Sequence, residues 1–388
     1  MPHLGVRSDL CQTRSRANFF DLSKYSAALE MSTGHSMKGS PVQSAVKSAG
    51  SADMKQQRRR LSVMSDNKLV EGFENSVSLD EAAEVAAPAQ AEGFIVNSYG
   101  GYSKKGYAPY NPKKKNQDTL IMAEDPKTRS LLFVVMDGHG EDGDKVSQGI
   151  KANFTQYLFK HKDFECDIQA ALTDVVARCE GEILRDASVE TDFSGTTFTC
   201  AVIRDNHCTL CNIGDSRTSI AFRSATGGVT AVALTADHKP DLPLEKARIE
   251  AKGGRVFAVE YDDGVDGPAR VWLGHMDVPG LAMSRSLCDA VAHTAGVSSE
   301  PEFVEYEFNP EREDLILVMA SDGLWEFMSD QEVMDLAYST TEPRFAVDRL
   351  ISESNERWMR EEQVIDDTTV CVAFLGKFQA SAGTSTGK

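Results

Sequence analysis

The sequence predicts a layered α+β fold in which strands and amphipathic helices alternate irregularly. Two short apolar runs, residues 131–136 and 315–320, are typical of strands that are covered on both faces. Two more, residues 198–203 and 208–213, flank Asp205-Asn206 and predict a β-hairpin. A further apolar run at 370–375 closes the pattern as a strand. Hairpins next to paired helices favour a layered α+β fold over a doubly wound parallel sheet.

Helices follow from apolar residues that repeat every three or four positions. Val146, Ile150, Phe154 and Leu158 show this spacing. A shorter helix begins near Pro243 and is stopped by two glycines, in keeping with the usual places of these residues at helix ends. The predicted helices cover residues 146–158, 168–183, 243–252, 331–338 and 345–360.

The 388 residues carry 41 basic and 59 acidic side chains, a net charge of −18. Because an acidic chain repels phosphates, a nucleic-acid partner is disfavoured. No apolar run approaches the roughly 18 residues that a transmembrane helix needs. The charge is segregated, since residues 1–60 have a net charge of +6 and the remainder −24.

Composition predicts three segments. Residues 1–92 are expected to form a mostly disordered extension, 93–375 a folded domain and 376–388 a flexible tail. Residues 80–92 are predicted to be a linker or a short helix. Three arginines precede Ser62, which is typical of a basophilic kinase site, with a plain basic patch as the alternative.

No secretory signal is evident, so the eight cysteines are expected to be reduced and the protein to be cytoplasmic or nuclear; an organelle transit peptide is the alternative. Cys208 and Cys211 form a lone CxxC. On a strand these two side chains point to opposite faces, which argues against zinc. We expect a monomer.

Aspartates stand at the ends of four predicted strands. Asp137, Asp215 and Asp322 follow apolar runs, and Asp366-Asp367 precedes the last one. A single aspartate after a strand is usually a turn former. Four such cases in one domain predict a shared site, because converging carboxylates repel one another unless a cation neutralises them.

An all-oxygen ligand set selects hard cations such as Mg²⁺ or Mn²⁺. Two such ions can bridge a water, lower its pKa and offset charge on a phosphoryl group, so that hydrolysis needs no protein nucleophile. The sequence contains none of the G-x-S-x-G, H-E-x-x-H or GxxxxGK[ST] motifs. The pattern therefore predicts a metal-dependent phosphoester hydrolase.

Over residues 93–375 the sequence resembles the PP2C (PPM) family of metal-dependent protein serine/threonine phosphatases. Eight motifs carry the resemblance and occur in the order typical of the family. They are Asn116-Gln117-Asp118, 133–140 (FVVMDGHG), 194–197 (SGTT), 214–217 (GDSR), 237–240 (DHKP), 281–289 (LAMSRSLCD), 320–326 (ASDGLWE) and 366–370 (DDTTV).

The resemblance implies a four-layer αββα sandwich of two antiparallel sheets flanked by helices, with the metal site at one edge between the sheets. It also implies roles for individual residues. Asp137 would bridge two metals, Gly138 would offer its carbonyl to one, and Asp322 and Asp366 would bind the other. Asp366 is preferred to Asp367 because the family's ligand lies three residues before a hydroxyl residue, here Thr369.

Further roles are implied for residues around the two metals. Asp118 would hold metal-bound waters, and Asp215 would bind a third, weaker metal. His139 would be the general acid for the leaving oxygen, a task that suits an imidazole. The position of Gln117 is often Glu in the family, and that of Glu326 is often Asp.

Lys113 stands where many members have an arginine that clamps the phosphate. A lysine pairs with phosphate only as a point charge, without the bidentate fork. The alternative for this lysine is an exposed loop position.

Other residues are expected to have structural roles. Gly195, Thr196 and Thr197 would shape the core beside the site, and His238 would belong to a turn. Arg285 and Asp289 are predicted to form a supporting ion pair. Residues 255–280 are predicted to be an irregular surface flap, in which Trp272 is either a core or a contact residue.

The leading interpretation is an active phosphatase for phosphoserine and phosphothreonine in phosphoprotein substrates. The first alternative is a catalytically silent PP2C-like scaffold that binds phosphoproteins. It is disfavoured because silent relatives usually lose metal aspartates, whereas Asp137, Asp322 and Asp366 are all present. The second alternative is a hydrolase for nucleotides or small phosphates.

Overall fold

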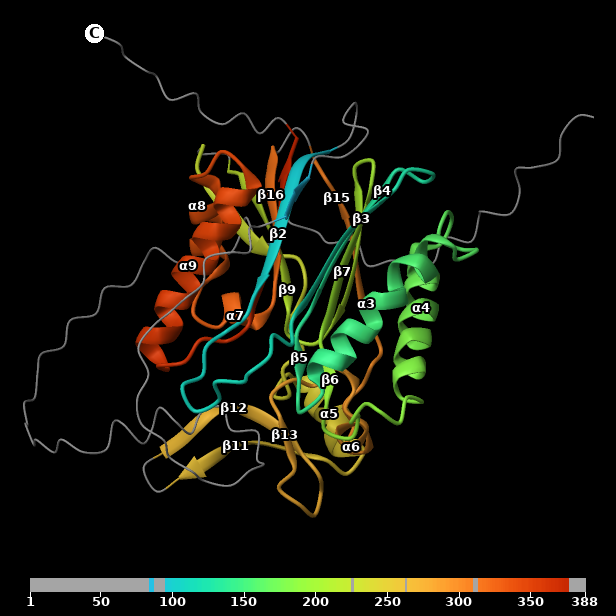
Figure 1. Cartoon of the computed structure of the whole chain (residues 1–388), viewed down its shortest axis with the longest axis vertical. Coiled ribbons are helices and arrows are strands. Elements are labelled where there is room, and N and C mark those ends of the chain that lie inside the picture. The colour runs from blue at the N-terminus through green and yellow to red at the C-terminus, as the bar shows by residue number, and fades with distance from the viewer. Residues whose placement is uncertain (1–83, 87–94, 225–226, 262–263, 310–312, 377–388) are drawn as a thin grey trace, which may run out of the picture.

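The computed structural model describes residues 84–86, 95–224, 227–261, 264–309 and 313–376 (Figure 1). The predicted kinase site at Ser62 and the tail after residue 376 lie outside these ranges. The prediction of a linker or a short helix over residues 80–92 was wrong for residues 84–86. Residues Glu84–Ala86 form strand β1, which pairs antiparallel with strand β2 (Val96–Lys104). The unpaired backbone groups of an edge strand offer such a segment hydrogen-bonding partners.

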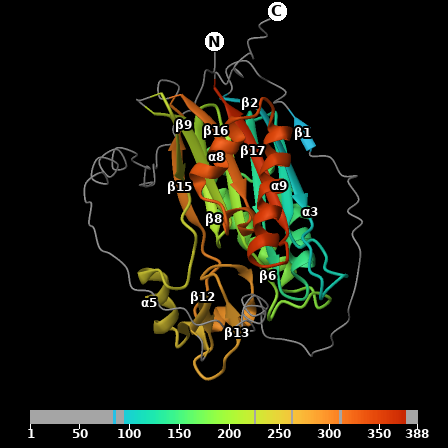
Figure 2. The same cartoon turned by 90° about the vertical axis from the view of Figure 1, so that its left-hand side faces the viewer.

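Two antiparallel sheets form the centre of the molecule (Figures 1 and 2). The first has the strand order β1-β2-β17-β16-β9-β10 and the second the order β15-β8-β7-β4-β3. The other strands of the first sheet are β9 (Arg217–Arg223), β10 (Val229–Ala233), β16 (Asp314–Ala320) and β17 (Thr368–Leu375). Those of the second are β3 (Thr119–Asp125), β4 (Ser130–Met136), β7 (Phe198–Arg204), β8 (His207–Ile213) and β15 (Glu302–Glu307).

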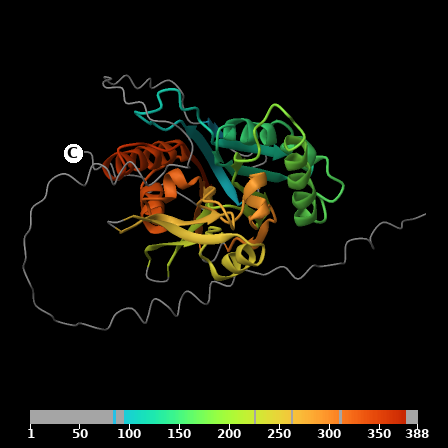
Figure 3. The same cartoon turned by 90° about the horizontal axis from the view of Figure 1, so that it is seen from below.

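Helices cover the outer face of each sheet, as the view from below shows (Figure 3). The first sheet carries α7 (Asp322–Trp325), α8 (Asp330–Tyr338) and α9 (Pro343–Glu361). The second sheet carries α3 (Gly143–Phe159) and α4 (Ile168–Ile183). The predicted four-layer αββα sandwich is therefore confirmed, and the predicted helices and the β7–β8 hairpin all form. None of the described helices combines the length and the apolar character that crossing a bilayer requires.

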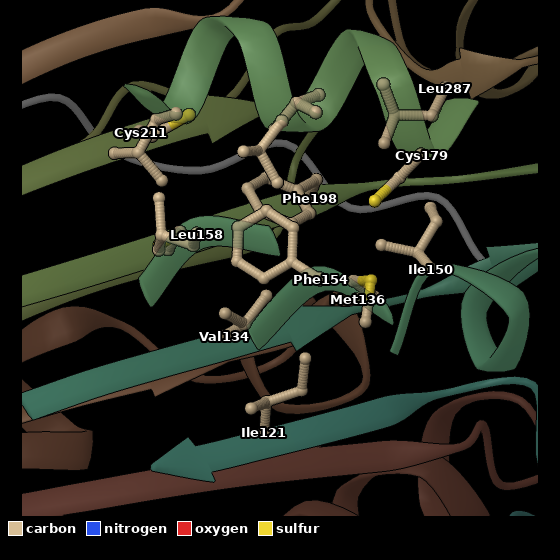
Figure 4. Packing of buried hydrophobic residues seen from close by; sticks show 14 of the residues in the cluster. Ile121, Val134, Met136, Ile150, Phe154, Leu158, Cys179, Phe198, Cys211 and Leu287 are labelled. Atoms are coloured by element: carbon tan, nitrogen blue, oxygen red, sulfur yellow. The ribbon is translucent and has the colours of Figure 1, made fainter. Parts of the chain in front are cut away.

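The apolar runs lie in the sheets because both faces of each strand are covered. Along β4, Val134 and Met136 pack toward α3 and α4, whereas Phe133 and Val135 pack between the two sheets. Figure 4 shows Val134 and Met136 beside Phe154 of α3. Strands buried on both faces read as continuous apolar runs because neighbouring side chains alternate between the two faces.

The two cysteines of the CxxC follow the same alternation. Cys208 lies in the core between the sheets and Cys211 in the core under the helices, and both thiols are free. The prediction that they face opposite sides of one strand is confirmed. They are therefore two separate core residues.

The predicted irregular flap is in fact a small sheet, with the order β11-β12-β13. Its strands are β11 (Arg255–Tyr261), β12 (Gly264–Trp272) and β13 (Pro279–Leu281). Trp272 is buried, stacks on Phe257 with ring centroids 5.1 Å apart, and donates from Nε1 to the Phe257 carbonyl at 3.0 Å. The aspartates and glycines in this stretch hide the strand pattern, since they lower β-propensity in any sequence-based prediction.

Beside this sheet, Glu245 ties helix α5 (Pro243–Ala251) to the segment that follows β13. Its carboxylate accepts hydrogen bonds from Arg285 at 2.9 Å, Arg248 at 2.6 Å and Ser284 at 2.6 Å. The predicted Arg285–Asp289 pair was thus wrong, because Arg285 binds Glu245. Burial alone would raise the pKa of Glu245, but these three donors outweigh it and lower the pKa to about 2.

We expect Glu245→Gln to destabilise the domain in a pH-dependent way. The folded-state pKa lies below the ordinary 4.5, so the carboxylate's contribution is present above pH 4.5 and is lost as the pH falls toward 2. At pH 7 the free energy of unfolding should fall by about 3 kcal/mol, and the difference should shrink in acid. Urea denaturation between pH 7 and pH 3 measures it. Glu250→Gln, on the same helix, is the matched control, and parallel pH profiles for Glu245→Gln and wild type would contradict the expectation.

Candidate metal centre

Five aspartates gather at one end of the two sheets, where strands begin or end. The clearest evidence that they lie close together is that the other four aspartates all act on the pKa of Asp137. Burial raises its pKa well above the ordinary range, and the charges of the other four raise it further. Those four are Asp118 before β3, Asp215 after β8, Asp322 after β16 and Asp366 before β17. The structure therefore brings together all the aspartates that the sequence proposed as metal ligands.

In the Asp118 carboxylate, one oxygen accepts a hydrogen bond and the other does not. It is buried, and its Oδ2 accepts a hydrogen bond from Ser321 at 2.7 Å. Its Oδ1 is also buried and has no hydrogen-bond partner among the described residues. Burial, together with the charges of Asp367 and Asp366, raises its pKa to about 8. A buried oxygen with this surplus of negative charge around it suits a cation or a cation-bound water.

Asp137 and Gly138 are held by neighbouring backbone. The Asp137 N–H donates to Thr197 Oγ1 at 2.9 Å, and the Thr197 N–H donates to the Asp137 carbonyl at 2.9 Å. A Cβ on Gly138 would lie 2.4 Å from the Gly143 carbonyl oxygen and 2.6 Å from that of Gln117. Only glycine fits there. Thr197 thus shapes the site, as predicted.

Asp366 and Asp367 have different surroundings. Asp367 is buried and accepts from the Gly106 N–H at 2.7 Å, the Gln117 N–H at 2.9 Å and Lys114 at 2.6 Å. Asp366 has a side chain that is 28% exposed and lies 3.7 Å from Lys114. Because Asp367 is committed to holding the loop around residue 117, the geometry supports Asp366 as the ligand of the two.

Two lysines reach into the aspartate cluster. Lys114 Nζ pairs with Asp367 and Asp366, and Lys239 Nζ pairs with Asp215 Oδ2 at 2.5 Å. Burial would lower the pKa of Lys239, but the charge of Asp215 raises it. Lys113, the predicted phosphate clamp, is exposed and forms no ion pair within the described part of the chain. The sequence spacing of the three lysines 113–115 does not show which of them points toward the aspartates. The excess of nearby carboxylates favours such a contact, and Lys114 makes it.

His139 stands beside the aspartates and has a partner that the sequence did not reveal. Its Nε2 lies 2.6 Å from Asp289 Oδ2. Burial would lower the pKa of His139, but the charge of Asp289 and this hydrogen bond raise it. Asp289, predicted to pair with Arg285, pairs with His139 instead.

Three other predicted positions lie around the cluster. Gln117 donates from Nε2 to the Gly140 carbonyl at 2.8 Å. Glu326 is exposed at the end of α7. His238 is buried, accepts at Nδ1 from the Gly214 N–H at 3.0 Å, and lies 3.1 Å from Glu302 through Nε2. Its role is therefore structural, as expected.

The residues present fit hard divalent cations in their chemistry. The donor set is all oxygen, and buried Oδ1 atoms of Asp118 and Asp215 have no hydrogen-bond partner among the described residues. Within these residues, no three His, Cys, Asp or Glu side chains already surround one point at ligand geometry. Two of the proposed ligand oxygens instead accept hydrogen bonds, Asp215 Oδ2 from Lys239 and Asp118 Oδ2 from Ser321, and Lys114 Nζ lies 3.7 Å from Asp366 Oδ1. Metal binding would therefore require some side chains to turn.

The chain belongs to the protein phosphatase 2C family, whose model matches residues 111–361. A probable protein phosphatase 2C of Oryza sativa subsp. japonica is 37% identical over 205 residues, which are 52% of this chain and 51% of that protein. The chain thus spans about half the length of that relative. One from Arabidopsis thaliana is 30% identical over 284 residues, covering 69% of this chain and 84% of that protein.

Solved structures agree on the fold. The serine-threonine phosphatase 2C of Toxoplasma gondii superposes with a TM-score of 0.64 at 20% identity, covering 76% of this chain and 98% of that one. A sex-determining protein of C. elegans superposes with a TM-score of 0.56, also at 20% identity, covering 72% and 65%. At this identity the likeness shows the architecture only.

We expect Asp137→Asn to be more stable than wild type without metal and less stable than wild type when metal is bound. Without metal, the free energy of unfolding should rise, because a carboxylate that the four neighbouring carboxylates repel is replaced by a neutral amide. With Mn²⁺ at 100 times its Kd, wild type should gain about 2.7 kcal/mol and the variant much less. Urea denaturation with and without Mn²⁺ tests this, with Asp174→Asn on α4 as control. A variant less stable than wild type in both conditions would count against the cluster.

Lys113 and Lys114 are neighbours in the chain with different surroundings, so their alanine variants can be compared directly. Lys114→Ala should lower the free energy of unfolding by roughly 1–3 kcal/mol, because it leaves the buried Asp367 without its cation. Lys113→Ala should leave stability unchanged and mainly raise KM for phosphopeptides, by up to about tenfold, or ~1.4 kcal/mol. Thermal melts and steady-state kinetics separate the two effects. An unchanged KM would show that Lys113 is only a surface residue.

Proposed function

We propose that this chain hydrolyses phosphoserine and phosphothreonine in proteins with two bound Mg²⁺ or Mn²⁺ ions. The observation that carries the proposal is the convergence of five aspartates on one end of the paired sheets. When bound, the cations supply an activated bridging water and offset the charge of the phosphoryl oxygens. With that water as the nucleophile, no side chain has to form a bond to phosphorus.

The chain's own residues then have separate tasks. Asp137 would contribute to both cations, with the Gly138 carbonyl on one side and Asp322 and Asp366 on the other. Asp118, buried behind them, would orient water through its unused Oδ1. These roles follow the family resemblance, and the burial and shared repulsion of the carboxylates support them.

Asp215 is the proposed ligand of a weaker third cation. Its Oδ2 already binds Lys239 at 2.5 Å. Glu326, at the position that is often Asp in the family, is exposed. Both observations support weak affinity at this third position.

His139 is proposed to donate a proton to the leaving seryl or threonyl oxygen. It follows Asp137-Gly138 directly, so the proton donor and the bridging ligand are fixed relative to each other by two peptide bonds. An alkoxide is a poor leaving group, and proton donation by a positioned side chain commonly contributes about 10²–10⁴-fold to the rate. The presence of Asp137, Asp322 and Asp366 supports catalysis over the silent-scaffold alternative.

The direct test is the full-length protein acting on a phosphothreonine peptide with Mn²⁺ or Mg²⁺. We expect turnover that falls by roughly 100-fold or more with EDTA, returns when metal is restored and resists okadaic-type inhibitors. Asp137→Asn is the inactive control, and ATP is the competing substrate. Faster turnover of ATP than of the peptide would indicate a small-phosphate hydrolase, and folded, metal-bound protein without turnover would indicate a scaffold.

A further inference from the structure

The partner of His139 is held unusually firmly. Asp289 has a side chain that is only 3% exposed, and its Oδ2 lies 2.6 Å from His139 Nε2. The same oxygen accepts a hydrogen bond from Ser286 Oγ at 2.6 Å. Because a carboxylate only accepts hydrogen bonds, the contact requires the hydrogen of the imidazole to be on Nε2. The other ring nitrogen, Nδ1, is buried, and the only other acceptor that acts on the ring among the described residues is the backbone of Asp137, at a geometry short of a full hydrogen bond.

A three-stranded miniature sheet brings these two residues together. Its order is β14-β6-β5, with β14 (Leu287–Cys288) and β5 (Gly138–His139) on either side of β6 (Gly195–Thr196). Gly195 pairs with both His139 and Cys288. A Cβ on Gly195 would lie 2.1 Å from Asp289 Oδ2. The missing side chain on the middle strand therefore lets the carboxylate reach across to the imidazole.

The backbone at Asp289 is shaped for this reach. Cys288 and Asp289 have φ values of 67° and 46°, a left-handed conformation that non-glycine residues rarely adopt. Asp289 also stands at the N-cap of helix α6 (Ala290–Thr294), yet its side chain makes no capping hydrogen bond. An aspartate at an N-cap ordinarily accepts from the first turn of its own helix. The Asp289 side chain therefore does not cap its own helix. Residues with a strained backbone of this kind cluster at functional sites.

We propose that Asp289 is the positioning residue for the proton donor. It holds His139 by Nε2–H, so that Nδ1–H is the hydrogen left to serve the leaving group. In this step His139 would begin with a hydrogen on each ring nitrogen. As the oxygen of the attacking water bonds to phosphorus, the P–Oγ bond breaks and its electron pair stays on Oγ, which takes the Nδ1 proton. His139 is left neutral with Nε2–H and regains a proton from solvent. The inference rests on the proposed phosphatase activity and adds the residue that orients its acid.

The test is Asp289→Asn compared on two substrates of the full-length protein in excess Mn²⁺. A phosphothreonine peptide leaves as an alkoxide and needs the proton, whereas p-nitrophenyl phosphate leaves as a stable phenolate and does not. We expect kcat for the peptide to fall by roughly 100-fold and kcat for p-nitrophenyl phosphate by about threefold or less. Equal losses on both substrates, or no loss on the peptide, would overturn the proposal.

A double-variant cycle separates positioning from general damage. On a His139→Asn background, adding Asp289→Asn should cause little further loss on the peptide, because groups that act as a unit are not additive. A full additional loss would mean that Asp289 acts elsewhere. If wild type itself does not turn over the peptide, the proposed function fails rather than this inference.

A spectroscopic measurement covers the case in which Asp289→Asn does not fold. In wild-type protein labelled with ¹⁵N-histidine, the shifts of the two ring nitrogens report which one carries the hydrogen when the ring is neutral. His139→Asn assigns the signals. A neutral His139 with its hydrogen on Nε2 supports the proposal, and one with its hydrogen on Nδ1 would refute it.

Discussion

Repulsion among the aspartates at one end of the sheets is the constraint on which this structure depends. Carboxylates that are buried together resist ionisation, as the raised pKa values of Asp118 and Asp137 show. The surrounding residues offset this repulsion in part. Lys114 and Lys239 bring positive charge to the rim, and Ser321 donates to Asp118. The remaining demand for positive charge is what makes the site suited to cations.

The hydrophobic core bears the cost of holding these charges together. The strands that deliver Asp137, Asp322 and Asp366 are β4, β16 and β17, and every residue of each is buried. Side chains on both faces of these strands join separate apolar clusters, one between the sheets and one under each helical layer. Strain and repulsion at a functional site persist only where the rest of the structure over-determines them. The site therefore lies where the most buried strands end.

The sequence predicted what is local or repeated, and missed what depends on a single direction or a long-range contact. Apolar runs and helical spacing predicted the layered α+β fold, because burial produces repeating apolar positions in helices and continuous apolar runs in covered strands. The four-layer sandwich was predicted from the family resemblance. The sequence did not indicate that Lys114, rather than its neighbours, pairs with Asp367, because the order of residues in a loop does not show which way each side chain points. The proposed contact of Lys113 with phosphate stays a prediction. The pairing of His139 with Asp289 joins residues 150 positions apart. Likewise, the short sequence distance between Arg285 and Asp289 does not indicate that Arg285 pairs with Glu245 instead.

The miniature sheet explains how one end of the sandwich can hold two kinds of chemistry. Asp137 belongs to the carboxylate cluster, whereas His139, two residues later, belongs to the β14-β6-β5 sheet with Asp289. Gly138 joins them and is closed in by the carbonyls of Gly143 and Gln117, so the joint cannot take a side chain. Gly195 plays the same part on the neighbouring strand, where its missing Cβ admits Asp289. Gly138 thus joins the carboxylates that would bind cations to the imidazole that would donate a proton, and Gly195 leaves room for the carboxylate that holds this imidazole.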